Sequence, residues 1–375
     1  MIIDNVKVYT EEKTFVKGGI MLDGDKIRRV YAEEEKPQFG EEEVLDGDGA
    51  YAIPGLIDLH FHGCKGDDFC DGNEEAIERI AQYEASIGVT AIAPATMTLP
   101  VEELKQILSV AAKYKKNGTS PKAADLVGIN MEGPFLDPAR KGAHVEEWIC
   151  RPDADLVRQL NQASGGLIRL VTLAPNVEGA GDFIREMHKE VCISLGHTAA
   201  DYDCAVEAMK MGAHHVTHLY NAMNPFVHRA PGLIGAAMDD PECMVELISD
   251  GYHIHPSAIR ATFRMFGPDR VILISDSMRA AGMPDGTYEL GGQEVTVGDR
   301  KAVLGDGTLA GSATNLYGCM CKAVEFGIPL GQAVKAATVN PARSIGIYDR
   351  VGSVAPGKEA DILLVTDHLE LKKVI

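Results

Sequence analysis

The sequence predicts an α/β protein in which a closed (β/α)8 barrel of the TIM type is joined to a small β domain formed by both ends of the chain. Two observations lead to this fold class. From residue 53 onward, a buried strand, a loop and an amphipathic helix recur in the same order, which is typical of parallel βα units. On either side of this region lie the short alternating runs of antiparallel strands.

The N-terminal part has the pattern of a small β unit. Residues 2–52 alternate apolar and polar side chains in short runs that end in turn dipeptides, and Asp23-Gly24 suits a tight hairpin. The stretch Gly357–Val365 returns to a strand pattern, so we expect it to rejoin the N-terminal unit. These patterns place a β domain, of the β-sandwich kind, at residues 1–52 and 346–375.

Residues 53–345 are assigned to the barrel. Helices are expected at Glu74–Ile87, Val101–Lys116 and Gly331–Thr338, where apolar residues recur at helical spacing. Glycine-rich β sequence at about 284–310 interrupts the repeat and is interpreted as an inserted hairpin. The eight strands are expected to end near His62, Thr96, Glu132, Pro175, His197, His218, Asp250 and Asp276.

Composition narrows the class of protein. The chain has 375 residues, 45% of them hydrophobic, and 36 basic against 55 acidic residues give a net charge of -19, which argues against nucleic acid as a partner. No apolar run approaches the roughly 18 residues of a membrane span and no secretory pattern opens the sequence, so we expect a cytoplasmic protein. The eight cysteines lack metal-binding spacing and are expected to be free thiols.

Polar residues recur where the barrel strands are expected to end. Side chains at the carboxyl ends of barrel strands converge on one mouth, although they are far apart in the sequence. Any one of these residues alone would be an ordinary polar group, but together they form a nitrogen and oxygen ligand set that suits zinc or iron. The predicted ligands are Glu132, His197, His218, His60 and His62.

The number of ions stays open at this point. Glu132, His197 and His218 can hold one divalent ion and leave a position for water. His60 and His62, two residues apart on one face of a strand, can hold a second, with Glu132 spanning two ions about 3.5 to 4 Å apart. Manganese or cobalt would also fit these ligands.

Two further residues have the chemistry of an amide hydrolase. A bound metal lowers the pKa of its water to about 7, which provides hydroxide at neutral pH. Asp276 is placed to act as general base and then acid, and His144, which follows the third strand, is placed to polarise a carbonyl group. His255 is expected to support the metal ligands without binding the metal, or to be structural.

These residues lie within long stretches that resemble the N-acetylglucosamine-6-phosphate deacetylase family of the amidohydrolase superfamily. The resemblance covers nearly the whole chain, and the stretch Leu219–Met223 separates this family from most other amidohydrolases. Related barrels often use a carbamylated lysine on strand four, which Ile168–Pro175 lacks. The matching stretches are Pro54–Gly63, Met131–Phe135, Lys141–His144, Leu195–Thr198, Thr217–Asn224, Ile274–Asp276 and Leu309–Ser312.

The resemblance implies a reaction and a substrate. The expected reaction is hydrolysis of the acetamide of N-acetylglucosamine 6-phosphate to glucosamine 6-phosphate and acetate, in amino-sugar catabolism and cell-wall recycling. The resemblance matches Glu132, His197 and His218 to the family's metal ligands. It matches Asp276 to the catalytic acid and base, and His144 to the group that faces the carbonyl.

The resemblance also implies how the sugar phosphate is bound. His253 would contact a sugar hydroxyl, Ala143 belongs with the substrate-binding residues, and Asn221 and the backbone of Ala222 lie on the phosphate side. Arg229 would reach the substrate from the neighbouring subunit of a homodimer and supply the positive charge that a phosphate needs.

Two rival functions and one rejected motif complete the sequence analysis. The same metal centre would serve another amide, such as a cyclic amide or a different acetylated amino sugar. A non-catalytic sugar-phosphate sensor would not need Asp276. Gly352–Lys358 matches most of a phosphate-binding P-loop, but Glu359 replaces the required Ser or Thr and strand-like sequence follows, so it is interpreted as a hairpin.

Overall fold

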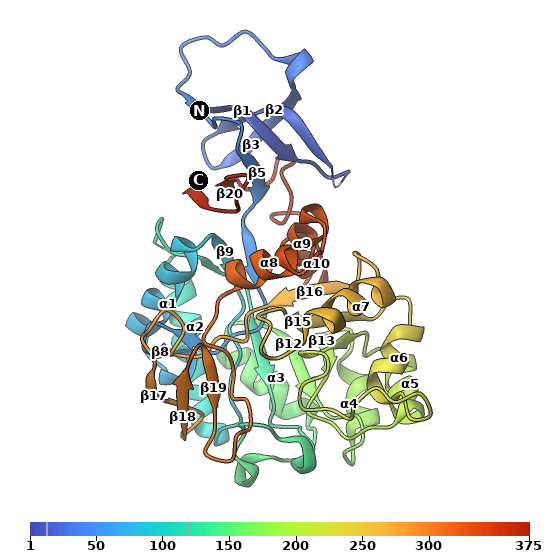
Figure 1. The fold of residues 1–375 in the computed structure, drawn as a ribbon. Helices are drawn as coiled ribbons and strands as arrows, with labels where there is room; N and C mark the ends of the chain where they lie inside the picture. The colour runs from blue at the N-terminus through green and yellow to red at the C-terminus, as the bar shows by residue number, and fades with distance from the viewer. Residues whose placement is uncertain (13, 119) are drawn as a thin grey trace.

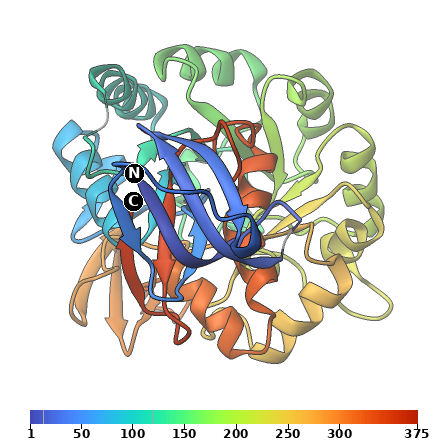
Figure 2. The same cartoon turned by 90° about the horizontal axis from the view of Figure 1, so that it is seen from above.

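The structure is a computed structural model that describes residues 1–12, 14–118 and 120–375. It has two parts, a barrel and a smaller β domain, and both chain ends lie in the β domain (Figure 1). Viewed from above, the β domain covers the middle of the barrel, and helices surround the barrel (Figure 2). The predicted fold class is confirmed.

The β domain contains a seven-stranded sheet in the order β21-β20-β5-β1-β2-β3, with β4 paired to β1. As predicted, Asp23-Gly24 begins the turn between β2 and β3, and β20 pairs antiparallel with β5, so the C-terminal segment rejoins the N-terminal one. The exact boundaries at residues 52 and 346 stay a prediction. The strands are β1 Ile2–Tyr9, β2 Phe15–Asp23, β3 Lys26–Ala32, β4 Val44–Asp46, β5 Tyr51–Pro54, β20 Ile362–Val365 and β21 Leu371–Val374.

Eight parallel strands form the barrel. Six follow one another in a single sheet, β11 to β16, while β6 and β9 belong to a second sheet with the short β10, Asp125–Leu126. A bridge between Ala95 and Asn130 and a 2.9 Å hydrogen bond from Asp276 N to His60 O connect the two sheets into a ring. The strands are β6 Leu56–Asp58, β9 Val89–Ile92, β11 Ile129–Glu132, β12 Ile168–Leu173, β13 Cys192–Leu195, β14 His215–Val216, β15 Met244–Ile248 and β16 Val271–Ile274.

Amphipathic helices cover the barrel because each has one apolar face. In α1, for example, Ile77 and Ile80 are buried, and the Asn73 side chain caps the first turn by accepting from Ala76 N. The predictions for α1, α2 and α9 are confirmed within one residue at each end. The helices are α1 Glu74–Ser86, α2 Val101–Asn117, α3 Ala154–Ala163, α4 Ala180–Met187, α5 Tyr202–Lys210, α6 Gly232–Asp239, α7 Pro256–Phe266, α8 Leu316–Glu325, α9 Leu330–Ala337 and α10 Val339–Ser344.

The insertion is larger than the predicted hairpin. It is a three-stranded antiparallel sheet of β17 Gly286–Leu290, β18 Gln293–Gly298 and β19 Lys301–Val303. The prediction missed the second turn, at Asp299-Arg300, because neither residue is glycine although both have positive φ, 50° and 62°. Its apolar face packs against Met97 and Met278 of the barrel.

The hydrogen-bonded strands end two to four residues before the predicted positions at all strands but β11. The hydrogen-bonded strands stop earlier, for example at Leu195 before His197 and at Ile274 before Asp276. The reason is the backbone, which turns into the left-handed region at both His197 and Asp276, with φ of 47° and 48°. The predicted positions therefore mark functional side chains that lie just beyond the strands.

Three smaller expectations can also be compared with the structure. All eight cysteines are free thiols, as predicted. Gly352–Lys358 is an irregular loop rather than a hairpin, because Lys358 Nζ binds the carbonyl oxygens of Tyr348 and Val351 and no strand precedes the turn. In the described ranges, no helix combines the length and hydropathy that a membrane span requires.

Candidate metal centre and active site

A cavity of about 230 Å³ opens at the carboxyl ends of the barrel strands. It brings together most of the predicted site residues, from β11 and from the loops that follow the other strands. His60 is the one predicted metal ligand that does not line it, because its side chain is fully buried behind the wall. The wall consists of His62, Met97, Glu132, Gly142, Ala143, His144, His197, His218, Asn221, Ala222, His253, Asp276, Leu290, Thr308, Leu309 and Gly311.

Several of these side chains are positioned by strained backbone conformations. His218, Ala222 and Asp276 have φ of 26°, 50° and 48°, in the left-handed region that non-glycine residues rarely adopt. Such strain costs of order 1–3 kcal/mol per residue and persists where the surrounding structure enforces it. The concentration of this strain around one cavity indicates a functional site.

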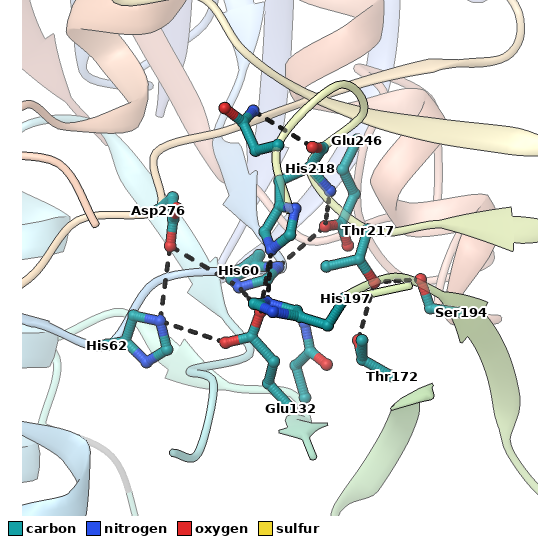
Figure 3. A network of polar contacts seen from close by, with 12 residues as sticks. His60, His62, Glu132, Thr172, Ser194, His197, Thr217, His218, Glu246 and Asp276 are labelled. Carbon is teal, nitrogen blue, oxygen red and sulfur yellow. Dashed lines mark hydrogen bonds and ion pairs between the residues drawn. The ribbon is translucent and has the colours of Figure 1, made fainter. Parts of the chain in front are cut away.

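Glu132 lies at the centre of the cluster, and five imidazole nitrogens face its carboxylate, four of them from residues labelled in Figure 3 and the fifth from His144. One group of nitrogens surrounds Oε1 and another surrounds Oε2, so the carboxylate lies between two sets of possible ligands. The Nε2 atoms of His197, His218 and His60 are 3.0, 3.1 and 3.3 Å from Oε1, and those of His62 and His144 are 3.4 and 3.5 Å from Oε2.

The hydrogen bonds of His197 test whether a cation fits. Its Nδ1 is 3.0 Å from the carbonyl oxygen of Arg140, which can only accept, so Nδ1 carries the proton and Nε2 has a free lone pair. That lone pair faces the Glu132 carboxylate at 3.0 Å and His218 Nε2 at 3.0 Å. Electron pairs that converge in this way are stable when a cation lies among them, so the residues fit a divalent metal ion.

His60 and His62 form the other side of the cluster. His60 Nδ1 is 2.9 Å from Glu246 Oε2, while its buried Nε2 has no hydrogen-bond partner in the described structure. The Nε2 atoms of His60 and His62 lie 3.7 and 3.5 Å from Asp276 Oδ1. Both strand-one histidines therefore point at the same space as Glu132 and Asp276. By spacing, two groups are suited to a binuclear divalent metal site, His60 with His62 and Glu132, and Glu132 with His144 and His197.

The electrostatics of the site favour positive charge. Burial raises the pKa of Glu132, but the charge of His60 and hydrogen bonds from the surrounding imidazoles outweigh it, so this pKa lies well below its usual range. Burial lowers the pKa of His60, yet the charges of Glu132 and Glu246 raise it well above its usual value. The carboxylates thus create a negative potential that a cation can neutralise.

His144 differs from His197 and His60 in which ring nitrogen carries the proton. The backbone N–H of Thr98 donates to His144 Nδ1 at 3.1 Å, so in the neutral ring the proton is on Nε2, which faces the cavity. Burial lowers the pKa of His144 to about 4 and keeps the ring neutral. Distances alone also allow Glu132, His144 and His197 to hold a metal, but an Nε2–H group is a donor and not a metal ligand.

Four of the residues predicted to contact the sugar phosphate line the same cavity. His253 is held by Asp250, whose Oδ2 lies 2.8 Å from His253 Nδ1, so its other nitrogen is free for a ligand. Asn221, Ala222 and Ala143 line the cavity as predicted. His255 lies outside this wall and is structural, because its side chain caps α7.

Arg229 does not line the cavity of its own chain. It lies at the exposed tip of a tight turn that two backbone hydrogen bonds between Val227 and Ala230 close. Phe226 and Val227, beside it, are 45% and 43% exposed. Within the described parts of the chain, the cavity wall contains no lysine or arginine.

The sequence analysis missed several residues of the site. Glu246 contacts His60, Thr98 fixes the His144 ring, and Met97, Leu290 and Leu309 form apolar wall. Glu246 had a signal in the sequence, a single charge inside the apolar run Met244–Ile248. Thr98 had none, because its contact is made by the backbone and depends on the fold.

A barrel with a buried cluster of histidines and carboxylates at its mouth is characteristic of metal-dependent hydrolases. Comparison with known proteins agrees, since residues 51–375 match the amidohydrolase family. Among curated relatives, an N-acetylglucosamine-6-phosphate deacetylase from Bacillus subtilis (strain 168) is 39% identical over 99% of this chain and 94% of its own. An N-acetylgalactosamine-6-phosphate deacetylase from Escherichia coli O157:H7 is 34% identical over 88% of each chain.

A solved structure extends the similarity to the fold. A mutant N-acetyl-D-glucosamine-6-phosphate deacetylase from Mycobacterium smegmatis, in complex with N-acetyl-D-glucosamine 6-phosphate, is 31% identical, with a TM-score of 0.92 over 100% of this chain and 97% of that one. The chain belongs to the N-acetylglucosamine-6-phosphate deacetylase family of the amidohydrolases. The predicted family is thereby confirmed.

Proposed function

We propose that this protein hydrolyses the acetamide of N-acetylglucosamine 6-phosphate, giving glucosamine 6-phosphate and acetate. The observation that carries the proposal is the combination at one cavity of a cation-binding cluster around Glu132, an Nε2–H donor on His144 and the carboxylate of Asp276. Amide hydrolysis needs a polarised carbonyl, an activated water and a proton for the leaving amine.

Each of these requirements has a candidate residue. When a divalent ion is bound by Glu132, His197 and His218, it supplies the Lewis acidity that activates a water molecule near neutral pH. Asp276 takes the proton of the attacking water and returns it to the amide nitrogen as the C–N bond breaks. His144 donates its Nε2 hydrogen to the carbonyl oxygen, where negative charge develops.

We assign the two strand-one histidines to a second ion position. His60 and His62 face the Oε1 and Oε2 atoms of Glu132, respectively, and the free lone pair on His60 Nε2 supports a ligand role. Glu132 would then be shared by the two positions. Zinc and iron remain the leading ions for this donor set.

Substrate binding is assigned to cavity residues outside the metal cluster. His253 contacts a sugar hydroxyl, and Ala143, Asn221 and the backbone of Ala222 position the sugar and its phosphate. Since the wall of the cavity has no cationic side chain among the described residues, Arg229 of a second copy completes the phosphate site in a homodimer.

The experiment that tests this function is acetate release from N-acetylglucosamine 6-phosphate, before and after chelation and with metal restored. The unphosphorylated sugar and N-acetylgalactosamine 6-phosphate are run beside it. Metal-dependent release from the phosphorylated glucosamine compound, and little from the unphosphorylated one, is expected. If N-acetylgalactosamine 6-phosphate is the better substrate, that sugar phosphate is the assigned substrate instead. If no compound releases acetate, the proposed function is wrong.

A further inference from the structure

Glu246 is a buried carboxylate to which the proposed reaction gives no part. It comes from β15, and its side chain is 0% exposed inside the barrel. A carboxylate in such a place destabilises the fold unless other groups satisfy its charge. Its contacts therefore indicate what it does.

One oxygen of Glu246 contacts two parts of the metal centre (Figure 3). Oε2 lies 2.9 Å from His60 Nδ1 and accepts a 3.2 Å hydrogen bond from the backbone N–H of His218. His60 follows β6 and His218 follows β14, so Glu246 connects residues that lie far apart in the sequence.

The contact with His60 decides which ring nitrogen carries the proton. A carboxylate can only accept, so in the neutral ring His60 Nδ1 donates and the Nε2 lone pair faces Glu132 Oε1 at 3.3 Å. The opposite tautomer would turn an N–H group toward the centre and repel a cation. A negative partner on Nδ1 also makes the imidazole a stronger ligand.

We propose that Glu246 is a positioning residue that fixes the Nδ1–H form of His60 and thereby sets the affinity of the strand-one position for a divalent ion. The inference rests on the proposed metal centre, and it does not depend on which amide the enzyme hydrolyses. Its test therefore uses metal binding and ring tautomers, without substrate, so that it can fail independently of the proposed activity.

The direct test is Glu246→Gln in the full chain. The amide oxygen can still accept from His60 and His218, so the shape is kept and the charge is lost. Metal-free protein is titrated with cobalt(II) at buffered free concentrations, and bound metal is counted by elemental analysis. Loss of such a partner weakens metal binding by roughly 10- to 100-fold. We expect a loss of this size at one ion position and a much smaller change at the other.

Two reference variants make the result specific. His60→Gln with His62→Asn removes both strand-one imidazoles and should abolish binding at the position that Glu246→Gln weakens. Glu84→Gln removes another buried carboxyl group, on α1, whose two oxygens have no hydrogen-bond partner in the described structure. It should leave cobalt binding unchanged, and thermal melting of each metal-free variant confirms folding.

A second measurement reads the tautomer itself. In metal-free protein labelled with ¹⁵N, at a pH high enough to leave the His60 ring neutral, the ring nitrogens of His60, assigned through the His60→Gln spectrum, should show protonated Nδ1 in the parent protein and a shift toward protonated Nε2 in Glu246→Gln. Unchanged cobalt affinity in Glu246→Gln, or an unchanged tautomer, would overturn the proposal. So would wild-type cobalt binding in the paired histidine variant, because His60 would then not be a ligand.

Discussion

At the scale of single residues, the partner of one ring nitrogen sets the role of the other. The carbonyl oxygen of Arg140 leaves a lone pair on His197 Nε2, whereas the backbone N–H of Thr98 leaves a hydrogen on His144 Nε2. Two histidines whose rings are 4.8 Å apart are thus prepared for opposite tasks, one as ligand and one as donor.

Asp276 is expected to be needed for turnover more than for metal binding. In Asp276→Asn the side chain keeps its size but cannot take a proton, so kcat should fall by ~10²-fold or more, the usual contribution of a general acid or base. Steady-state kinetics and elemental analysis of the same preparation check this. A variant that keeps its kcat would remove Asp276 from the proton transfer, and one that loses metal would make it a ligand.

Glu84 gives a prediction about stability and pH. Burial raises the pKa of this carboxyl well above its usual range. Between the unfolded and folded pKa values, the folded state keeps a proton that the unfolded state has lost, so the free energy of unfolding falls as pH rises. Glutamine cannot ionise, so Glu84→Gln lacks this pH-dependent loss of stability. The free energy of unfolding of the variant, relative to that of the parent protein, should therefore increase from pH 5 to pH 8.

Urea unfolding at both pH values measures the effect. Glu75→Gln, an exposed change on the same helix, is the control and should show a difference that does not vary with pH. If the Glu84→Gln difference is also constant, Glu84 ionises normally in the folded protein.

The site residues that the sequence could predict are those with strand-end positions and metal-binding chemistry. His60, Glu132 and His218 fall in this class, because parallel strands bring their ends together whatever the details of packing. Glu246 and Thr98 could not be assigned, since their roles come from contacts between strands and loops that no spacing encodes.

At the scale of elements, the inserted sheet β17–β19 completes the wall of the cavity. It contributes Leu290, which is 2% exposed, and Gln293, whose side chain binds the backbone oxygen of Ala143 next to His144. Gly291 packs so closely that a Cβ atom there would lie 2.8 Å from Met97 Cε. Met97 and Leu290 both line the cavity and form an apolar surface, which suits the methyl group of an acetamide.

Leu290→Ala should relax the preference for short acyl groups. Because one methylene in such a pocket is worth roughly 10- to 200-fold in discrimination, kcat/KM for an N-butyryl substrate relative to the N-acetyl one should rise by ~10-fold or more. Val295→Ala, in the same apolar cluster but outside the cavity wall, is the matched control. An equal change in both variants would mean that the sheet acts through its stability alone.

The elements themselves were predictable to different degrees. Strand and helix order followed from periodicity, and α1 was predicted to within a residue because its cap and apolar face are local features. The third strand of the insertion was not, since β19 is only three residues long and follows a turn whose two central residues are not glycine.

At the scale of the whole molecule, the net charge of -19 opposes binding of an anionic substrate. Because the described cavity wall has no lysine or arginine, a positive side chain for the phosphate has to come from another part of the molecule or from a second copy. Arg229 lies on an exposed turn beside Phe226 and Val227. Exposed apolar residues beside a functional cation are typical of an interface. The proposed homodimer would bury them and place each arginine in the other subunit's site.

This arrangement predicts that two inactive variants restore each other. In a mixed dimer of Arg229→Ala and Asp276→Asn, one site combines an intact Asp276 with the partner's intact Arg229, while the other site lacks both. By the two-fold symmetry of such a dimer, the mixed species isolated through two different affinity tags should show about half the activity of the parent dimer. Each variant alone, purified in the same way, is the control and should stay inactive. A mixed dimer without activity, or a protein that light scattering shows to be a monomer, would place the phosphate-binding cation within a single chain.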